Sequence, residues 1–363
     1  MQSDHPAFDT HADQKEPSYS TFRHWVDRFI PANFHDLPGL ARRLLLEGKP
    51  AGRMAIVYSI MGLIMIPFDS VLQIAERKYY DHIGQSQLPQ LFVCGAPRSG
   101  TTVVAQTLIK HLPVFYFNNL TSLFPRSPIT ANKLFGRMLP DNQQELPLES
   151  FYGRTTRLSY PNDALYIWDR WVGLDRKKIP TAFAPATQVE LARFFSAIEA
   201  YSGKPLVAKN NNLNTYAHLV APVLPHAYFI CLDRDPLYLA QSLFLARKFI
   251  NGDEHLPYGI QGPVSKKDDP MEDICQQALF HQALNKRQQE RIGADRFIIL
   301  PYEDFCSRPA YWVAKVAEEI LGQPLDRAKL EAQLPPLTVA NKRKVDAATF
   351  QALAKTLDRL TTP

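Results

Sequence analysis

The stretch Leu91–Thr102, LFVCGAPRSGTT, decides the fold of this chain. Its first four residues, Leu91–Cys94, are apolar and predict a short buried strand of a parallel sheet. A loop framed by Gly95 and Gly100 follows, and a segment with a helical pattern begins at Thr101. A strand, a tight glycine loop and a helix start direct successive backbone N–H groups and the positive end of the helix dipole toward one point. We therefore expect an anion-binding site here.

The charge of this loop differs from that of a nucleotide kinase. Thr101 stands where the Walker A phosphate loop has a lysine, although the spacing from Gly95 to Gly100 matches that loop. Arg98 supplies positive charge from inside the loop instead. Because a guanidinium is a planar fork that suits tetrahedral oxyanions, the loop favours a phosphate or sulfate ligand. A glycine-rich turn that binds no ligand is the alternative interpretation.

The six residues Pro97–Thr102, PRSGTT, resemble the 5′-phosphosulfate loop of the sulfotransferases, enzymes that use 3′-phosphoadenosine 5′-phosphosulfate (PAPS). The similarity extends in order over residues 90–310, leaves residues 1–85 uncovered, and is greater to bacterial and carbohydrate sulfotransferases than to cytosolic ones. It implies PAPS as co-substrate and no metal, since arginine, lysine and backbone groups would hold the leaving bisphosphate. It also implies that the phosphosulfate is bound by Pro97, Arg98, Ser99, Gly100, Thr101 and Thr102.

The composition is that of a globular protein with anionic ligands. The 363 residues are 45% hydrophobic and 11% aromatic, enough for one large domain or two smaller ones with a sizeable core. The net charge of +5 suits anionic ligands or an anionic membrane surface. It is too small and too scattered to indicate binding of nucleic acid.

The cysteines and the first residues indicate the compartment. The four cysteines are widely spaced and form no CxxC or Cys/His metal motif, so buried thiols in a reducing compartment are expected. Residues 1–20 contain acidic side chains and no apolar run, so no secretory signal is visible. We therefore expect a cytoplasmic protein, either free or attached to a membrane surface.

Apolar runs typical of strands alternate with long helical segments. This pattern predicts an α/β fold of the P-loop type, with a parallel sheet of about five strands flanked by helices. The expected strands are Leu91–Cys94, Val114–Phe117, Leu206–Ala208, Ala227–Leu232 and Phe297–Leu300. Ligands of such sheets bind beyond the carboxyl ends of the strands. The expected parts of the chain are a disordered tail at 1–21, a helical extension at 22–88 and the sulfotransferase domain at 89–363.

The helical extension contains an apolar run, Met54–Ile66, which Pro67 ends. The run has 13 residues, fewer than the ~20 that a helix needs to cross a bilayer. One interpretation is a peripheral membrane contact through residues 22–80, because basic amphipathic helices bind the lipid interface. The other, slightly favoured, is an extension packed on the core or on a second subunit. The oligomeric state is left open. Basic residues flank the run at Lys49, Arg53, Arg77 and Lys78.

A second phosphate site is expected at Arg234 and Ser242, which lie at a strand end and on the following helix. The resemblance implies that they bind the 3′-phosphate, to which a guanidinium and a hydroxyl can both donate. The alternative is that the Arg-Asp-Pro turn only starts a helix. The basic run Lys342, Arg343 and Lys344 resembles the C-terminal loop that closes over the nucleotide in this family, with a solvated charged face as the alternative.

Two cations are expected to act in catalysis. Lys209 ends the strand at Leu206–Ala208, and the resemblance implies that it contacts the sulfonate and its bridging oxygen. A cation there stabilises the charge that develops on the leaving phosphate. Arg98, in the phosphosulfate loop, is the second. A solvated lysine at a strand end is the alternative interpretation of Lys209.

The general base is the least defined part of the pattern. Cytosolic sulfotransferases have a histidine two residues beyond the lysine, and this chain has Asn211 there. Bacterial and carbohydrate enzymes often use a carboxylate, and the Pro-Asn-Asp segment that ends at Asp163 resembles theirs. Asp163 is therefore the first candidate, Asp169 the second and His111 the third. The segment Tyr302–Asp304 also resembles the family and is interpreted as structural.

These features predict a sulfotransferase that moves a sulfonate group from PAPS to a hydroxyl acceptor by in-line displacement. The aromatic side chains between Phe151 and Trp171 suit a carbohydrate, a glycolipid or another small alcohol, although such density is also common in cores. One alternative is a P-loop kinase of small molecules, which Thr101 disfavours. The other is a nucleotide-binding protein without catalytic activity, which Asn211 would suit.

Overall fold

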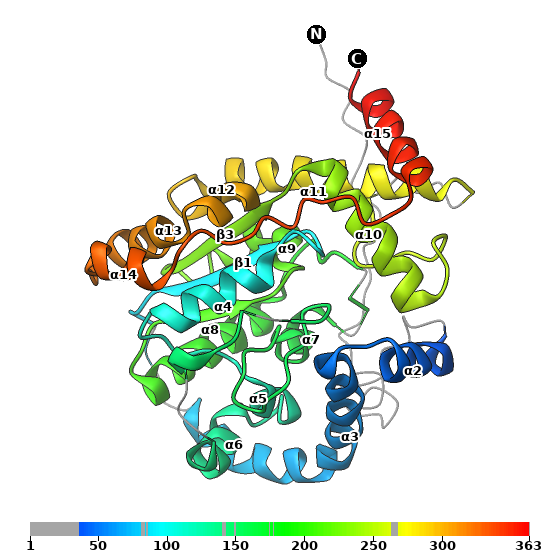
Figure 1. Cartoon of the computed structure of the whole chain (residues 1–363). Coiled ribbons are helices and arrows are strands. Elements are labelled where there is room, and N and C mark those ends of the chain that lie inside the picture. The colour runs from blue at the N-terminus through cyan, green and yellow to red at the C-terminus, as the bar shows by residue number, and fades with distance from the viewer. Residues whose placement is uncertain are drawn as a thin grey trace.

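The architecture is a parallel sheet of four strands in the order β2-β1-β3-β4 (Figure 1). The computed structural model describes residues 36–80, 84, 86–139, 143–148, 150–173, 175–176, 178–262 and 268–362. The strands are β1 (Gln90–Gly95), β2 (Leu206–Lys209), β3 (Ala227–Asp233) and β4 (Phe297–Pro301). The predicted α/β fold with a parallel sheet flanked by helices is therefore confirmed, with four strands over the described residues in place of about five.

The predicted strand at Val114–Phe117 is wrong. Phe115 makes one isolated bridge beside Leu206, through hydrogen bonds from its N–H to the Pro205 carbonyl and from the Val207 N–H to its own carbonyl. The chain then leaves the sheet, because Asn118 caps the next helix with its side chain. A polar cap so close to the bridge prevents the apolar run from pairing further.

Side chains of β1 alternate between two buried clusters. Leu91 and Val93 pack on one face of the sheet with residues of the helices α4 (Thr101–His111), α12 (Tyr302–Ser307) and α13 (Pro309–Lys315). Phe92 and Cys94 pack on the other face with residues of α7 (Leu165–Val172), α8 (Pro185–Ser202) and α9 (Leu213–Val220). Helices on both faces explain why a whole strand can be apolar. The four cysteines are buried free thiols, as the sequence predicts.

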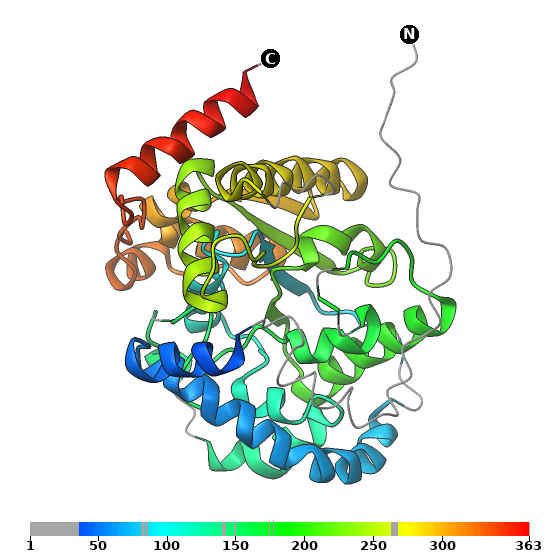
Figure 2. The same cartoon turned by 90° about the vertical axis from the view of Figure 1, so that its right-hand side faces the viewer.

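The helices cover the sheet and extend beyond it at two edges. Figures 1 and 2 place α2 and α3 along one edge of the molecule and α15, next to the C-terminus, at the opposite edge. The helices are α2 (Leu37–Leu46), α3 (Pro50–Glu76), α4 (Thr101–His111), α5 (Asn119–Leu123), α6 (Pro128–Phe135), α7 (Leu165–Val172), α8 (Pro185–Ser202), α9 (Leu213–Val220), α10 (Pro236–Asn251), α11 (Pro270–Ile292), α12 (Tyr302–Ser307), α13 (Pro309–Lys315), α14 (Arg327–Gln333) and α15 (Ala347–Thr361). Short helical turns are η1 (Arg77–Tyr79), η2 (Gly136–Met138), η3 (Gln143–Glu145) and η4 (Val316–Ile320).

The extension differs from its prediction in length. Pro67 does not end the apolar run, and α3 continues through it for 27 residues in all. Pro67 lies on the exposed side, where water can satisfy the carbonyl that proline leaves without a donor. Within the described residues, Pro50–Tyr79 is the one stretch long and apolar enough to cross a membrane by length and composition, a test that core helices also pass. The predicted tail at 1–21 and the first part of the extension lie outside the described residues.

Candidate active site

The loop between β1 and α4 is built on unusual backbone angles. Gly95, Arg98 and Gly100 have φ of 137°, 74° and 103°. A Cβ on Gly100 would lie 2.3 Å from the ring of Tyr302, and one on Gly95 would lie 2.7 Å from the Leu232 carbonyl oxygen. Glycine is therefore required at both ends of the loop, and Arg98 holds a strained conformation between them. Such strain is typical of ligand-binding loops.

Helix α4 begins at this loop with its N–H groups open. Gly100 is the N-cap and offers no side chain to cap the helix. The first N–H groups of any helix lack an acceptor within the helix, and the helix dipole is positive at this end. The loop and the start of α4 together therefore form a concave site for an anion.

Arg98 is held from two sides. Its Nε lies 3.3 Å from Ser242 Oγ on α10, and its guanidinium lies 4.5 Å from the centre of the Tyr152 ring. Its carbonyl oxygen accepts a hydrogen bond of 2.9 Å from the guanidinium of Arg234, at the end of β3. The two residues expected to bind the 3′-phosphate, Arg234 and Ser242, thus both meet at Arg98.

Arg234 also holds the C-terminal segment. It is 7% exposed and donates to the Ala340 carbonyl and to Asn341 Oδ1, each at 2.9 Å. Its guanidinium lies over the ring of Tyr302, 5.1 Å from the ring centre. Burial lowers the pKa of Arg234, and Tyr302 and Glu303 oppose that change. Arg234 therefore joins the Gly95–Gly100 loop to the segment that follows α14.

The basic run lies beside α10 through its backbone. Gln241 donates to the Lys342 carbonyl at 3.0 Å and accepts from the Lys344 N–H at 2.6 Å. The side chains of Lys342 and Arg343 are exposed and do not line the pocket described below. Burial, followed by the charges of Arg234 and Arg98, lowers the pKa of Lys344. Lys344 is exposed as well and does not line the pocket, so its link to the loop is electrostatic.

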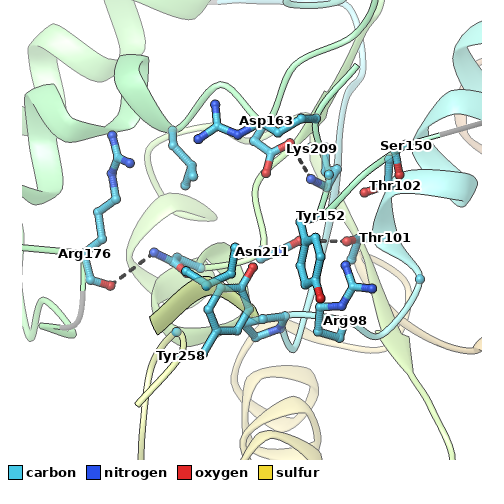
Figure 3. A pocket seen from close by; sticks show the side chains of 18 of the residues that line it. Arg98, Thr101, Thr102, Ser150, Tyr152, Asp163, Arg176, Lys209, Asn211 and Tyr258 are labelled. Carbon is cyan, nitrogen blue, oxygen red and sulfur yellow. Dashed lines mark hydrogen bonds and ion pairs between the residues drawn. The ribbon is translucent and has the colours of Figure 1, made fainter. Parts of the chain in front are cut away.

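Lys209 and Asp163 form an ion pair. Lys209 Nζ at the end of β2 lies 2.5 Å from Asp163 Oδ1, and the two side chains are 5% and 23% exposed. Gly153, with φ of 80°, passes so close that a Cβ there would lie 3.3 Å from Lys209 Nζ. The cation and the carboxylate expected to act in catalysis are therefore in contact, as Figure 3 shows.

The other candidate bases do not reach this place. Asp169 is 1% exposed, and both of its oxygens accept from Arg176, at 2.9 and 2.6 Å. His111 ends α4, ten residues and about 15 Å from Thr101 at the 1.5 Å rise of a helix. Asn211 accepts from the Thr101 hydroxyl at 2.7 Å and braces the start of α4. Asp163 is the candidate that geometry supports.

One pocket of about 350 Å³ contains these groups (Figure 3). Its charged side chains are mostly cationic, with Asp163 as the single carboxylate among the described lining residues. A pocket with this imbalance attracts anions. Its cations are Arg98, Arg154, Arg176, Lys209 and Arg234, and its aromatic residues are Tyr152, Tyr166, Tyr258 and Tyr302.

A loop after α10 closes one side of the pocket. A Cβ on Gly259 would lie 2.6 Å from Pro97 Cγ, so the loop that contains Gly259 packs against the loop that contains Pro97. Gln277 of α11 donates to the Tyr258 and Ile260 carbonyls at 2.8 and 2.9 Å. Burial raises the pKa of Tyr258, which keeps its phenol protonated beside the cations. These contacts position Tyr258 at the pocket.

A buried histidine supports the same loop. His281 Nδ1 lies 3.0 Å from the Asn214 amide nitrogen, and Nε2 lies 3.2 Å from the Ile260 carbonyl oxygen. The amide donates to Nδ1, so Nε2 carries the proton and donates to the carbonyl. Burial lowers the pKa of His281 to about 4. The ring is therefore neutral at physiological pH and serves as a fixed strut.

Among the cationic and aromatic pocket residues, three have no place in the sequence prediction: Arg154, Arg176 and Tyr258. Arg154 lies in the aromatic-rich stretch that the sequence analysis assigns to the acceptor. That stretch indicated a part of the pocket, although nothing in the sequence pointed to Arg154 itself. Arg176 and Tyr258 come from loops without a motif. Within the described residues, no group of three or more histidine, cysteine, aspartate or glutamate side chains could hold a metal ion.

The phosphate loop, the strand-end lysine and its carboxylate lie inside a region that matches a known family. Residues 89–326 match the model of the sulfotransferase family. The chain belongs to this family. The pocket therefore lies almost entirely in the part of the chain that defines a sulfotransferase, and the chain is an enzyme that transfers a sulfonate group.

Solved structures match this sulfotransferase, and one of them, STF9, is similar to it in fold. The sulfotransferase STF9 from Mycobacterium avium is 16% identical with a TM-score of 0.52, covering 86% of each chain. STF1 from Mycobacterium tuberculosis H37Rv is 14% identical with a TM-score of 0.49, over 91% of this chain and 93% of that one. The sulfotransferase domain of the Synechococcus PCC 7002 olefin synthase is 17% identical with a TM-score of 0.35, over 78% and 97%. No curated protein matches the chain in sequence.

Proposed function

We propose that this sulfotransferase moves a sulfonate group from PAPS to a hydroxyl acceptor. The observation that carries the proposal is the arrangement of the pocket. The open N-terminus of α4 and Arg98 form one wall, and the Lys209–Asp163 ion pair lies in the same pocket. An anion site next to a paired cation and carboxylate has the groups that in-line transfer to a hydroxyl needs.

The donor would be held by backbone and guanidinium groups. Residues Pro97–Thr102 would bind the 5′-phosphosulfate at the helix N-terminus. Arg234 and Ser242, which both contact Arg98, would bind the 3′-phosphate, and Lys342 and Arg343 would close over it. The residues fit such a donor because the lining carries five cations and one carboxylate. No metal is needed to balance the bisphosphate.

The chemical step would use the ion pair. The acceptor oxygen attacks sulfur, the bond from sulfur to the bridging oxygen breaks, and adenosine 3′,5′-bisphosphate leaves. The acceptor proton passes to the Asp163 carboxylate, and the Lys209 ammonium stabilises the charge on the departing phosphate. Their contact at 2.5 Å in a mostly buried place orients both groups before substrates arrive.

The acceptor would be a carbohydrate, a glycolipid or another small alcohol. Tyr152, Tyr166 and Tyr258 offer ring faces and hydroxyls in the pocket, which suits a polyhydroxylated group. We place the transferase domain at residues 89–363 and the reaction in the cytoplasm, with contact to a membrane through the extension.

Calorimetric titration with adenosine 3′,5′-bisphosphate, and with ATP plus magnesium in parallel, tests the donor. We expect bisphosphate binding that is at least tenfold weaker in Arg98→Ala and unchanged in Arg308→Ala, a control on an exposed ion pair. Preference for ATP with magnesium would indicate a kinase instead. Bisphosphate binding without transfer from labelled PAPS to a panel of sugars, glycolipids and alcohols would indicate a binding protein.

A further inference from the structure

Helix α3 presents an apolar stripe to the outside of the molecule. Six large side chains recur on one face at intervals of three or four residues, and they are 42–72% exposed. Single exposed apolar residues are ordinary, but a continuous stripe of this length marks an interaction surface. The stripe consists of Val57, Ile60, Ile64, Phe68, Val71 and Ile74.

The opposite face of α3 is fixed to the protein. Asp69 is 4% exposed and accepts from the Ser127 hydroxyl at 2.6 Å. Glu76 is fully buried and accepts from the N–H and the hydroxyl of Thr130, at 2.7 and 2.6 Å. A helix anchored by buried carboxylates along one side cannot cross a bilayer alone. It can only lie flat, with the stripe outward.

Neighbouring elements extend the stripe into a surface, which we call the apolar edge. Helix α3 packs on α2, α5 and α6. Leu45 and Leu46 of α2 are 53% and 69% exposed, and Met138 of the η2 turn after α6 is 80% exposed. Figures 1 and 2 show α2 and α3 along the same outer edge of the molecule.

The exposed charges beside the apolar edge are mostly basic, and Glu47, next to Leu46, is an acidic exception. Between Lys49 and Tyr80, the two described acidic residues are Asp69 and Glu76, and both are buried. The exposed charged residues of that stretch are basic: Lys49, Arg53, Arg77 and Lys78. Lys133 and Arg137 on α6 and η2 are exposed as well. An apolar surface flanked by cations matches the interface of a bilayer that contains acidic lipids.

A second hollow lies at the C-terminal end of α3. Its volume is about 570 Å³, and four arginines line it: Arg77, Arg126, Arg170 and Arg193. Glu190 is the one carboxylate in the described lining, and it pairs with Arg170 at 3.1 Å. Guanidinium groups bind phosphate through paired hydrogen bonds. The hollow therefore has the chemistry of a phosphate-headgroup site at the margin of the apolar edge.

We infer that the apolar edge docks on an anionic membrane and that the four-arginine hollow takes the phosphate headgroup of an acidic lipid. Three features favour a lipid surface over a second copy of this chain. The exposed charges on α3 and the turns beside it are basic, and Glu47 after α2 is an acidic exception, so two copies facing each other would repel through their net positive charge. The four-arginine hollow needs an anionic ligand, and the apolar edge of a second copy would not supply one. The flat orientation of α3 suits an interfacial helix.

Vesicle flotation tests the inference with the full chain. Vesicles of phosphatidylcholine alone are compared with vesicles containing 30 mol% phosphatidylglycerol, at about 50 mM salt so that charge is little screened. We expect at least tenfold stronger partitioning onto the anionic vesicles. The double variant Phe68→Glu/Ile74→Glu should lose at least tenfold on both kinds of vesicle. Tyr311→Glu, which changes an exposed aromatic residue of α13, is the matched control and should bind like the wild type.

The hollow is tested by a charge reversal. Arg77→Glu/Arg193→Glu should lower the preference for anionic vesicles at least threefold and keep the weaker binding to neutral ones, because both side chains are exposed and the apolar edge is unchanged. Glycerol phosphate at millimolar concentration should not release the wild type, since a free headgroup lacks the bilayer.

Three results would overturn the inference: no binding to either vesicle, equal binding by the Phe68→Glu/Ile74→Glu variant, or a wild-type dimer in light scattering that this variant dissociates. Flotation needs no turnover, so its outcome is independent of the proposed reaction.

Discussion

The two walls of the pocket are built by different means. One wall, which we propose binds the phosphosulfate and call the donor wall, is a contiguous segment from β1 through Pro97–Thr102 into α4, and its binding groups are largely backbone. The other, where we propose the acceptor oxygen reacts and which we call the acceptor wall, collects side chains from distant segments, among them Lys209 of β2, Asp163 before α7 and Tyr258 after α10. A contiguous backbone site leaves a motif in the sequence, whereas a dispersed side-chain site leaves single residues. A steric change should therefore be enough to impair binding at the donor wall, whereas the loss of one functional group should impair the reaction at the acceptor wall.

The largest effect is expected from the acceptor wall. Asp163→Asn keeps the shape of the ion pair but removes the base, so the turnover rate should fall about 10²–10⁴-fold, the usual contribution of general acid–base catalysis. Binding of adenosine 3′,5′-bisphosphate, measured by calorimetry, should change less than threefold. Asp253→Asn, which alters an exposed aspartate paired with His255, serves as the control. More than half of the wild-type rate in Asp163→Asn would assign the base elsewhere.

The donor wall should break at Gly100. An alanine there places its Cβ 2.3 Å from the ring of Tyr302 at a φ of 103°, so either the loop or the ring must move. We expect bisphosphate affinity to fall about 100-fold, or ~3 kcal/mol. Gly203→Ala separates the two causes, because Gly203 also has a positive φ, of 61°, but has no atom within 4 Å of a Cβ. Equal losses in both variants, measured by calorimetry and thermal melting, would mean that the contact with Tyr302 does not matter.

The free energy of unfolding should depend on pH through His281, which supports the loop that closes the pocket. Since burial lowers the pKa of His281 from 6.5 to about 4 in the folded state, the unfolded state binds a proton first as the pH falls. The contribution of His281 to the free energy of unfolding should therefore be constant above pH 6.5 and decrease between pH 6.5 and 4. The decrease is at most about 3 kcal/mol, at 1.36 kcal/mol per unit.

Urea unfolding at several pH values measures this change. His281→Gln should be less stable than the wild type at pH 7 and should lose less stability between pH 6.5 and 4. A pH dependence identical to that of the wild type would assign the effect to another group. His255→Gln is the matched control, since His255 lies on the surface and is half exposed.

The smallest effect is expected where the two walls meet. The Arg98 guanidinium lies 4.5 Å from the Tyr152 ring, a contact worth about 0.5–2 kcal/mol. Tyr152→Leu should weaken bisphosphate binding about three- to tenfold in calorimetry, whereas Tyr152→Phe keeps the ring and should bind like the wild type. Equal weakening by both would show that the hydroxyl, and not the ring face, holds Arg98.

The same contrast explains how much the sequence could predict. Leu91–Thr102 identified the sheet, the loop and the family, because hydrophobic pattern and glycine spacing are local properties. The points at which helices and strands end were harder to predict from the sequence. Val114–Phe117 looked like a strand, but Asn118 turns the chain away, and Pro67 looked like a stop, but contacts on the opposite face of α3 carry the helix through it.

Long-range pairing was the other limit. Asp163 and Asp169 are six residues apart and chemically alike, yet one faces Lys209 and the other is held by Arg176. The Pro-Asn-Asp segment favoured Asp163, but only the fold shows that Asp163 meets Lys209 of β2 and that Arg176 holds Asp169. Arg154 and Tyr258 were missed for the same reason, since each becomes a pocket residue only through packing.

The contacts that α2 and α3 make beside the pocket have a consequence for how the molecule unfolds. Arg43 of α2 donates to the Phe249 and Ile250 carbonyls at 2.6 and 3.2 Å, and Gly52 of α3 is so close to the Phe151 ring that a Cβ would lie 2.9 Å away. Both places adjoin the pocket wall, where Ile250 and Tyr152 lie. The extension is therefore thermodynamically coupled to the catalytic frame, and heating should give a single cooperative transition in calorimetry with no separate melting of α2 and α3.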